Sequence, residues 1–279
     1  GLCVDGRAGE MSAATLFWRR EAAAPLLKTW FPSAVAREVM QTEDGGPLWE
    51  AEWDRVLMMH WSVPVEVLQK VVPFPLDVHE GRAWVSAVAF TLRGMRLAGR
   101  GILGRWQLPF THHGFLNLRA YVRVGDEAGI FFLREWVPAV PSIPLSRPLY
   151  GLPFSRGCLH YQHEPENGVL RGRVEAEGAA LRYEADMPGS YDTCEAGSRT
   201  EFLMERYSAF TEWRGWKRRF HVWHPPWWQS AVSVRVTDDS LLGLTGEWAA
   251  QARYEGAHYS PGLPSVWMGR PRALQTSAF

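Results

Sequence analysis

Residues 114–136 constrain the fold more than any other stretch of this sequence. Polar and apolar residues alternate along the first part of the stretch, which is the period of a β-strand with two different faces. Residues 125–129 supply the turn of a hairpin, and the returning segment is apolar on both faces, as in a covered strand. One face of the first strand carries three polar side chains in register: Asn117, Arg119 and Tyr121. The hairpin therefore predicts one dry face and one face that lines a polar cavity.

Most of the remaining chain also reads as short strands. Further strands are expected over 53–61, 82–92, 157–163, 168–175, 180–185, 231–236 and 247–254. Helices are expected over 12–27, 32–40, just after Pro64, and over 199–210. The prolines between 137 and 157 exclude a regular helix or central strand there. About ten strands with three or four short helices predict an α+β fold, predominantly antiparallel, of the kind that closes into a barrel.

The segment 42–47, Thr-Glu-Asp-Gly-Gly-Pro, breaks the pattern and marks a predicted domain boundary. We expect an N-terminal helical arm over 1–47, a barrel domain over 48–273 and a short tail over 274–279.

Charge and cysteine content narrow the function. The 30 basic and 30 acidic residues cancel, so neither nucleic acid nor an acidic membrane surface is an expected partner. Three widely spaced cysteines form no disulfide framework, which favours a reducing, cytoplasmic location. No apolar run approaches the ~18 residues that a membrane span needs.

Nine short motifs together resemble the YqjF-like family of uncharacterised conserved proteins, over roughly residues 50–273. They are His60–Pro64, Gly81–Trp84, Asn117–Val122, Gly129–Phe132, Gly151–Pro153, Glu205–Tyr207, His224–Trp227, Ser260–Gly262 and Gly269–Pro271. That family is in turn similar to the acetoacetate-decarboxylase-like superfamily. The resemblance implies a closed antiparallel barrel with a small-molecule site inside.

The sequence departs from the decarboxylases at the decisive position. Their Gly-Phe-Pro-Lys motif carries the lysine that forms a Schiff base, whereas here Gly151-Leu-Pro153 is followed by Phe154. Many YqjF-like relatives also carry an acid where this chain has Phe115. The resemblance therefore implies the fold without the amine chemistry.

Two groups of residues are the candidate site. The candidate substrate-binding residues are Arg119, Asn117, Tyr121, Arg147, Phe154 and His224, with Arg119 as a bidentate partner for a carboxylate. Glu135 and Glu205 are the candidate catalytic acids or bases, although ion pairing with the adjacent arginines is the alternative for each. His160 with His163 and His221 with His224 stand three residues apart, and on a strand such pairs point to opposite faces, so no metal site is expected.

These observations predict a barrel that binds a small organic molecule, with a carboxylate as the expected group, and that acts on it, if at all, by non-covalent acid/base chemistry without a cofactor. A binding or structural module with a vestigial pocket is the alternative. A decarboxylase-like lyase with a relocated lysine is a second one, for which Lys28, Lys70 and Lys217 are the lysines available. The sequence leaves open the ligand and whether the protein forms a homo-oligomer.

Overall fold

The computed structural model describes residues 32–98, 112–138 and 143–274. The expected helix over 12–27 and most of the loop before the central hairpin lie outside these residues. None of the helices in the described ranges is long and apolar enough to cross a membrane.

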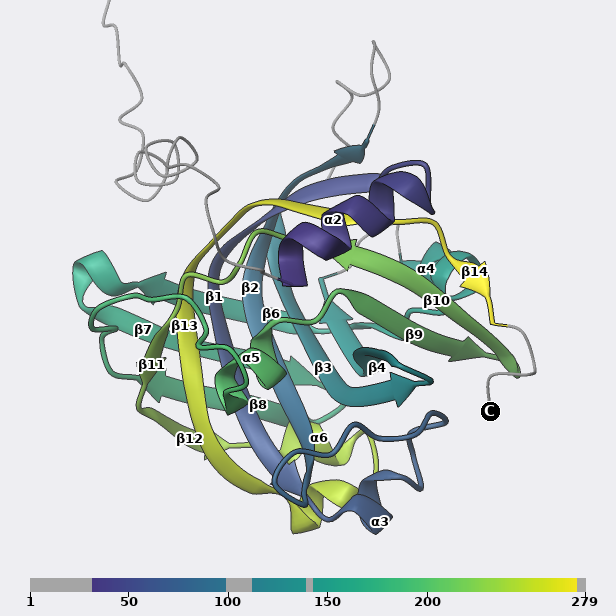
Figure 1. The fold of residues 1–279 in the computed structure, drawn as a ribbon. Coiled ribbons are helices and arrows are strands. Elements are labelled where there is room, and N and C mark those ends of the chain that lie inside the picture. Colours follow the sequence, from purple (N-terminus) through teal and green to yellow (C-terminus); the bar gives the residue numbers. More distant parts are fainter. Residues whose placement is uncertain (1–31, 99–111, 139–142, 275–279) are drawn as a thin grey trace, which may run out of the picture. The chain divides into compact units, whose positions relative to one another are not determined.

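Seven strands close into a barrel (Figure 1). Around the ring they are β13 (Arg253–Met268), β1 (Trp49–Val63), β2 (Ala83–Leu97), β3 (His113–Val124), β4 (Glu127–Val137), β9 (Ser208–Trp213) and β10 (Trp216–Trp223). The ring closes where Val222 and Trp223 of β10 pair with Met268 and Trp267 of β13. Neighbours are antiparallel except β4 with β9. The predicted antiparallel barrel is confirmed, and the hairpin over 114–136 forms β3 and β4.

Three short strands extend this sheet, and a second sheet covers it. β5 (Phe154–Arg156) pairs with β4, β11 (Ser230–Val232) with β13, and β14 (Arg272–Ala273) with β10. The second sheet contains β6 (Cys158–Glu164), β7 (Val169–Ala176), β8 (Ala179–Ala185) and β12 (Val234–Asp238). Its apolar side chains, such as Val174 and Leu181, pack with Leu116, Leu118 and Ala120 of β3 in one core cluster.

The alternation along β3 separates two cores. Even-numbered residues of β3 face the covering sheet, whereas Phe115 and Tyr121 belong to a second cluster with side chains of β1, β9, β10 and β13. This second cluster lies inside the barrel, and we call this interior the lumen. Helix α5 (Arg199–Met204) contributes Leu203 and Met204 to it.

The other helices are short. They are α2 (Pro32–Thr42), α3 (Val65–Leu68), α4 (Ile143–Tyr150) and α6 (Ser240–Gly243), with 3-10 turns at Pro165–Asn167 and Glu247–Gln251.

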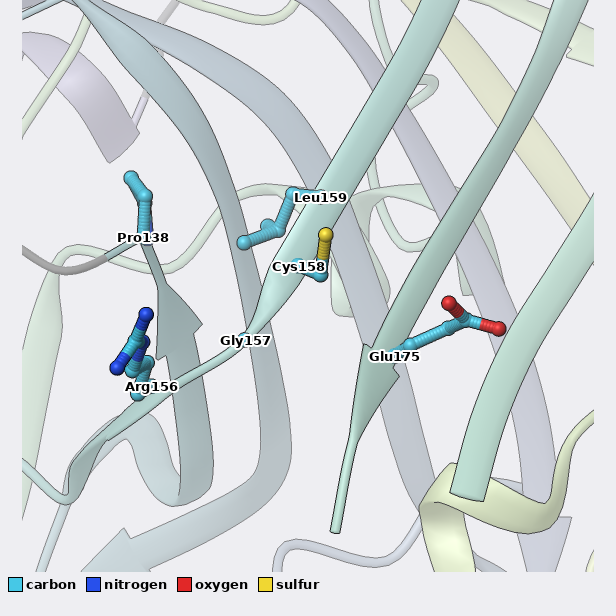
Figure 2. A pocket seen from close by; sticks show the side chains of 6 residues that line it. All are labelled: Pro138, Arg156, Gly157, Cys158, Leu159 and Glu175. Atoms are coloured by element: carbon cyan, nitrogen blue, oxygen red, sulfur yellow. The ribbon is translucent and has the colours of Figure 1, made fainter. Parts of the chain in front are cut away.

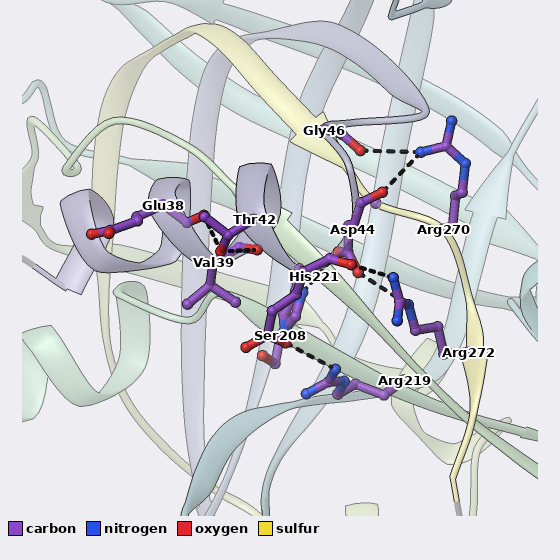
Figure 3. A network of polar contacts seen from close by, with 12 residues as sticks. Glu38, Val39, Thr42, Asp44, Gly46, Ser208, Arg219, His221, Arg270 and Arg272 are labelled. Atoms are coloured by element: carbon purple, nitrogen blue, oxygen red, sulfur yellow. Dashed lines mark hydrogen bonds and ion pairs between the residues drawn. The ribbon is translucent and has the colours of Figure 1, made fainter.

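Helix α2 and the loop after it are bound to the barrel at its closing seam (Figure 3). The Ser33 hydroxyl donates to the His224 carbonyl at 2.5 Å. The Asp44 carboxylate accepts hydrogen bonds from His221 at 2.8 Å and forms an ion pair with Arg272 at 3.2 Å. Contacts group residues 31–279 into one compact unit. The domain boundary at 42–47 stays a prediction, and in the structure this loop supplies the buried carboxylate of Asp44 to the seam.

Several predicted elements differ from those observed. The helix expected over 199–210 ends at Met204, and β9 begins at Ser208. The strand expected over 247–254 is a 3-10 turn over Glu247–Gln251, after which β13 begins. Helix α4 forms in the proline-rich segment because Pro144 stands in its first turn, where a missing N–H costs nothing, and only Pro148 lies inside it.

Candidate functional site

The three polar residues of β3 lie together on its lumen face. Asn117, Arg119 and Tyr121 are 2%, 4% and 0% exposed. Burial of a charged guanidinium is costly unless it is hydrogen-bonded or paired. The polar face of the hairpin is thus turned into the barrel rather than toward solvent.

Arg119 is held by the end of helix α5. Its Nη2 donates to the Leu203 carbonyl at 2.9 Å, and the Tyr121 hydroxyl donates to the same oxygen at 2.8 Å. The last carbonyls of a helix have no intrahelical donor, so this oxygen is a natural acceptor. The Arg119 Nε, also buried, has no hydrogen-bond partner among the described residues. The guanidinium is therefore fixed at one end and unsatisfied at the other.

Glu135 lies opposite Asn117 in the β3–β4 pairing and is 3% exposed. Burial alone raises the pKa of its carboxyl well above the usual value. Its Oε2 and the Asn117 Oδ1 are buried without a partner among the described residues. The expected ion pair of Glu135 with Arg134 does not form, because the Arg134 guanidinium binds Glu177. Burial therefore favours the protonated form of Glu135, which can donate a proton, and the ionised form can accept one.

The Glu135 carboxyl should make stability depend on pH. A raised pKa in the folded state means that unfolding releases a proton once the pH exceeds the unfolded pKa of about 4.3, so stability falls by about 1.4 kcal/mol per pH unit until the folded pKa is reached. Glu135→Gln should remove this slope, raising the melting temperature at pH 7 and leaving it nearly unchanged at pH 4. Glu184→Gln, at an exposed residue, is the control. Equal pH profiles for wild type and Glu135→Gln would contradict the assignment.

Glu205 and His224 are neighbours, and both contact Tyr207 and Trp227. The Glu205 carboxylate accepts hydrogen bonds from the Trp227 backbone N–H at 2.9 Å and from the Tyr207 hydroxyl. The His224 ring stacks on Tyr207, with 4.6 Å between ring centroids. Burial lowers the pKa of His224, and the Glu205 charge partly opposes this. The alternative for Glu205, an ion pair with Arg206, does not hold, because Arg206 binds Asp77 at 2.7 Å.

Of the remaining candidates, Phe154 belongs to this interior and Arg147 does not. Phe154 pairs with Glu135 along β5, and its ring lies edge-on to Phe115 with 5.5 Å between centroids. Arg147 is exposed on α4. The convergence of Arg147 with Arg119 that was expected is therefore absent, because the helix formed by residues 143–150 turns this side chain outward.

Sequence reasoning missed a second polar group on the lumen side of the barrel. His60 of β1 and Ser86 of β2 are buried, and they connect Tyr121 to His258 of β13. His60 stands in a motif that carries the family resemblance, which was an available signal. His258 had none, because no strand was predicted beyond residue 254, whereas β13 runs from Arg253 to Met268.

Two surface cavities lie elsewhere. One, of about 500 Å³, is lined by Pro138, Arg156, Gly157, Cys158, Leu159 and Glu175, as Figure 2 shows. The other, of about 240 Å³, lies at the β9–β10 turn. Neither is lined by a predicted site residue. Of the paired histidines, His160 is exposed and His163 buried.

The architecture matches solved structures of acetoacetate-decarboxylase-like proteins. An acetoacetate decarboxylase from Legionella pneumophila subsp. pneumophila is 11% identical, with a TM-score of 0.57 over 82% of this chain and 88% of that one. An acetoacetate decarboxylase-like enzyme from Sphingomonas wittichii RW1 is 18% identical, with a TM-score of 0.55 over 82% and 94%. The enduracididine biosynthesis enzyme MppR, complexed with pyruvate, is 14% identical, with a TM-score of 0.55 over 83% and 91%. The fold is thus that of the acetoacetate decarboxylase-like class.

The sequence comparisons narrow the class to a family. Residues 50–264 match the model of DUF2071, described as uncharacterized conserved protein, so the chain belongs to that family. The uncharacterized protein YqjF of Bacillus subtilis (strain 168) is 26% identical over 205 residues, which are 71% of this chain and 83% of that protein.

Proposed function

We propose that the lumen binds a small organic molecule bearing a carboxylate, and that Arg119 is its anchor. The observation that supports this most directly is the set of unpartnered buried atoms on the lumen face: Asn117 Oδ1, Arg119 Nε and Glu135 Oε2. Unsatisfied buried polar atoms are rare because each costs roughly 1–3 kcal/mol. A polar ligand that pairs with them would remove that cost.

The same groups define the chemistry of the proposed site. A fixed guanidinium binds a carboxylate, and the Asn117 amide orients a neighbouring oxygen. Glu135, whose pKa burial raises, donates a proton to a carbonyl oxygen in its protonated form and removes one from an adjacent carbon when ionised. Phe115, Phe154 and Trp227 supply apolar walls around these groups. The set suits a small keto acid.

Pyruvate is the probe that tests the anchor, since the structurally similar MppR was solved with it. Arg119→Met keeps the apolar stem and removes the charge, so it should weaken pyruvate binding about 10- to 150-fold, the equivalent of about 1.5–3 kcal/mol for a charged hydrogen bond. Saturation-transfer NMR measures the affinity. Arg235→Met, at an exposed arginine on β12, is the matched control and should bind as wild type does. Unchanged binding in Arg119→Met would refute the anchor.

Binding without chemistry is the alternative function, and deuterium uptake separates the two. If Glu135 exchanges protons with a bound keto acid, the methyl protons of pyruvate in D2O should be replaced faster with wild type than with Glu135→Gln. Wild-type binding with no uptake above the buffer rate would leave a binding module as the function.

A further inference from the structure

A chain of hydrogen bonds runs from a partly exposed histidine to the Arg119 anchor. The His258 Nδ1 lies 3.0 Å from the His60 Nε2, and the His60 Nδ1 lies 2.6 Å from the Ser86 Oγ. The Ser86 Oγ lies 2.6 Å from the Tyr121 hydroxyl, which reaches the Leu203 carbonyl beside Arg119. Its members come from β13, β1, β2 and β3, which are consecutive neighbours in the sheet, so the pairing of these strands brings them together.

The donor and the acceptor of each hydrogen bond in this chain follow from the bond between the Tyr121 hydroxyl and the Leu203 carbonyl. The Tyr121 hydroxyl has one proton and donates it to the Leu203 carbonyl, so Ser86 must donate to Tyr121. The proton of Ser86 is then used, and His60 must donate from Nδ1. A neutral His60 accepts at Nε2, which makes the His258 Nδ1 the donor there. If both histidines are neutral, this single arrangement of donors and acceptors gives each of the four residues a partner for every hydrogen bond in the chain.

The surroundings keep both histidines neutral. Burial, followed by the charges of His258, Arg119 and Arg199, lowers the pKa of His60 well below its usual value. Burial and then Arg199 lower the pKa of His258 to about 4. Arg206 lies over the Tyr121 ring at 5.3 Å. The two arginines that lower the pKa values of these histidines, Arg119 and Arg199, are cationic and therefore disfavour a second proton on either ring.

The two ends of the chain differ in access. His60, Ser86 and Tyr121 are 2%, 0% and 0% exposed. His258 is partly exposed, and its Nε2 lies 3.4 Å from the Thr200 hydroxyl of α5. A proton can enter where water reaches His258, whereas the inner end lies at the lumen anchor.

We propose that His258, His60, Ser86 and Tyr121 form a proton path between solvent and the lumen. When Tyr121 gives its proton to a base in the lumen, Ser86 replaces it, His60 replaces that of Ser86 from Nδ1, and His258 passes its own to the His60 Nε2. Water returns one proton to the His258 Nε2, so the number of protons is restored and no electron is transferred. Both histidines then stand in the other tautomer, and the reverse transfer or rotation of the rings restores the starting one. The use of this path in a reaction rests on the proposed function; its existence does not.

Exchange of the Tyr121 hydroxyl proton tests the path in the intact protein without ligand. In a mixture of H2O and D2O, tyrosine labelled with ¹³C at Cζ gives two lines for slow hydroxyl exchange and one averaged line for fast exchange. Tyr183 is an internal control. Its hydroxyl lies 2.8 Å from the His163 Nε2, and the His163 Nδ1 lies 2.7 Å from the Arg55 carbonyl. A carbonyl has no proton to pass on, so no proton path continues from this pair.

We expect one averaged line for Tyr121 and two lines for Tyr183 in the wild type. Ser86→Ala interrupts the path and should slow Tyr121 exchange about tenfold or more, giving two lines, with Tyr183 unchanged. His258→Phe, at the partly exposed end, should do the same and serves if Ser86→Ala does not fold. Two lines for Tyr121 in the wild type, or an averaged line that survives both variants, would overturn the path. Failure of pyruvate to bind would refute the anchor and leave this result standing.

Discussion

Phe154→Lys should give this barrel a trappable amine that the wild type lacks. Phe154 follows Gly151-Leu-Pro153, where the decarboxylase motif that this segment resembles is expected to have its lysine, and its side chain packs against the lumen cluster at the residue paired with Glu135. Burial lowers the pKa of a lysine, which supplies the neutral amine that imine formation needs. Glu135, as a neutral acid, would protonate the departing hydroxyl. Borohydride reduction in the presence of acetoacetate should therefore yield a covalent adduct by mass spectrometry, mapped to residue 154.

The wild type should give no such adduct, because its described lysines are placed unfavourably. Lys70 is exposed, and the Lys217 Nζ donates to the Pro73 carbonyl at 2.8 Å beside Phe74, which belongs to the cluster outside the lumen. Arg235→Lys, which adds an exposed amine, is the control. A wild-type adduct mapped to Lys217 would revive a decarboxylase with a relocated nucleophile. An unreactive Phe154→Lys protein that folds would show that the lumen cannot admit acetoacetate.

Lys217 also shows where local sequence reasoning failed. The segment 215–219 is basic and contains glycine, a pattern typical of an exposed turn, yet only Arg214 and Gly215 form the turn and β10 begins at Trp216. The strand is needed because β10 closes the barrel against β13. Closure is a long-range property, so neither strand of the seam carried a local signal. The prolines and the glycine within 261–264 are residues that local patterns assign to turns, so the second half of β13 was not predicted either.

The central hairpin was predictable because alternation alone assigns its faces. That assignment placed Asn117, Arg119 and Tyr121 on one face, and Glu135 follows from its pairing with Asn117. The contacts of these residues were not predictable. The Leu203 carbonyl reaches Arg119 only because α5 stops at Met204, whereas the apolar spacing of 199–210 favoured a longer helix. His258 joins His60 through the pairing of β1 with β13, which brings together residues 198 positions apart in the sequence.

Loss of the Asp77 carboxylate should cost about 3–5 kcal/mol of stability, the range measured when one partner of a buried ion pair is removed. Arg206 binds Asp77 at 2.7 Å, with side-chain exposures of 4% and 9%. The Arg206 Nε also donates to the Phe202 carbonyl at 2.7 Å, and its Cζ lies 4.2 Å from the centre of the Phe202 ring. Asp77→Ala would leave this guanidinium buried without its carboxylate. Chemical denaturation of wild type and variant measures the difference.

The ion pair of Asp77 with Arg206 also connects the stability of the protein to ligand binding in the lumen. Arg206 holds the carbonyl of Phe202, and the next carbonyl along α5, that of Leu203, is the acceptor for Arg119. Asp77→Ala should therefore weaken pyruvate binding as well as stability, although Asp77 does not touch the proposed anchor. Glu184→Ala removes the carboxylate from the exposed pair with Arg235 and should cost less than about 1 kcal/mol, with binding unchanged. If Asp77→Ala were as mild as Glu184→Ala, water would have to satisfy Arg206, and the end of α5 would not depend on the ion pair.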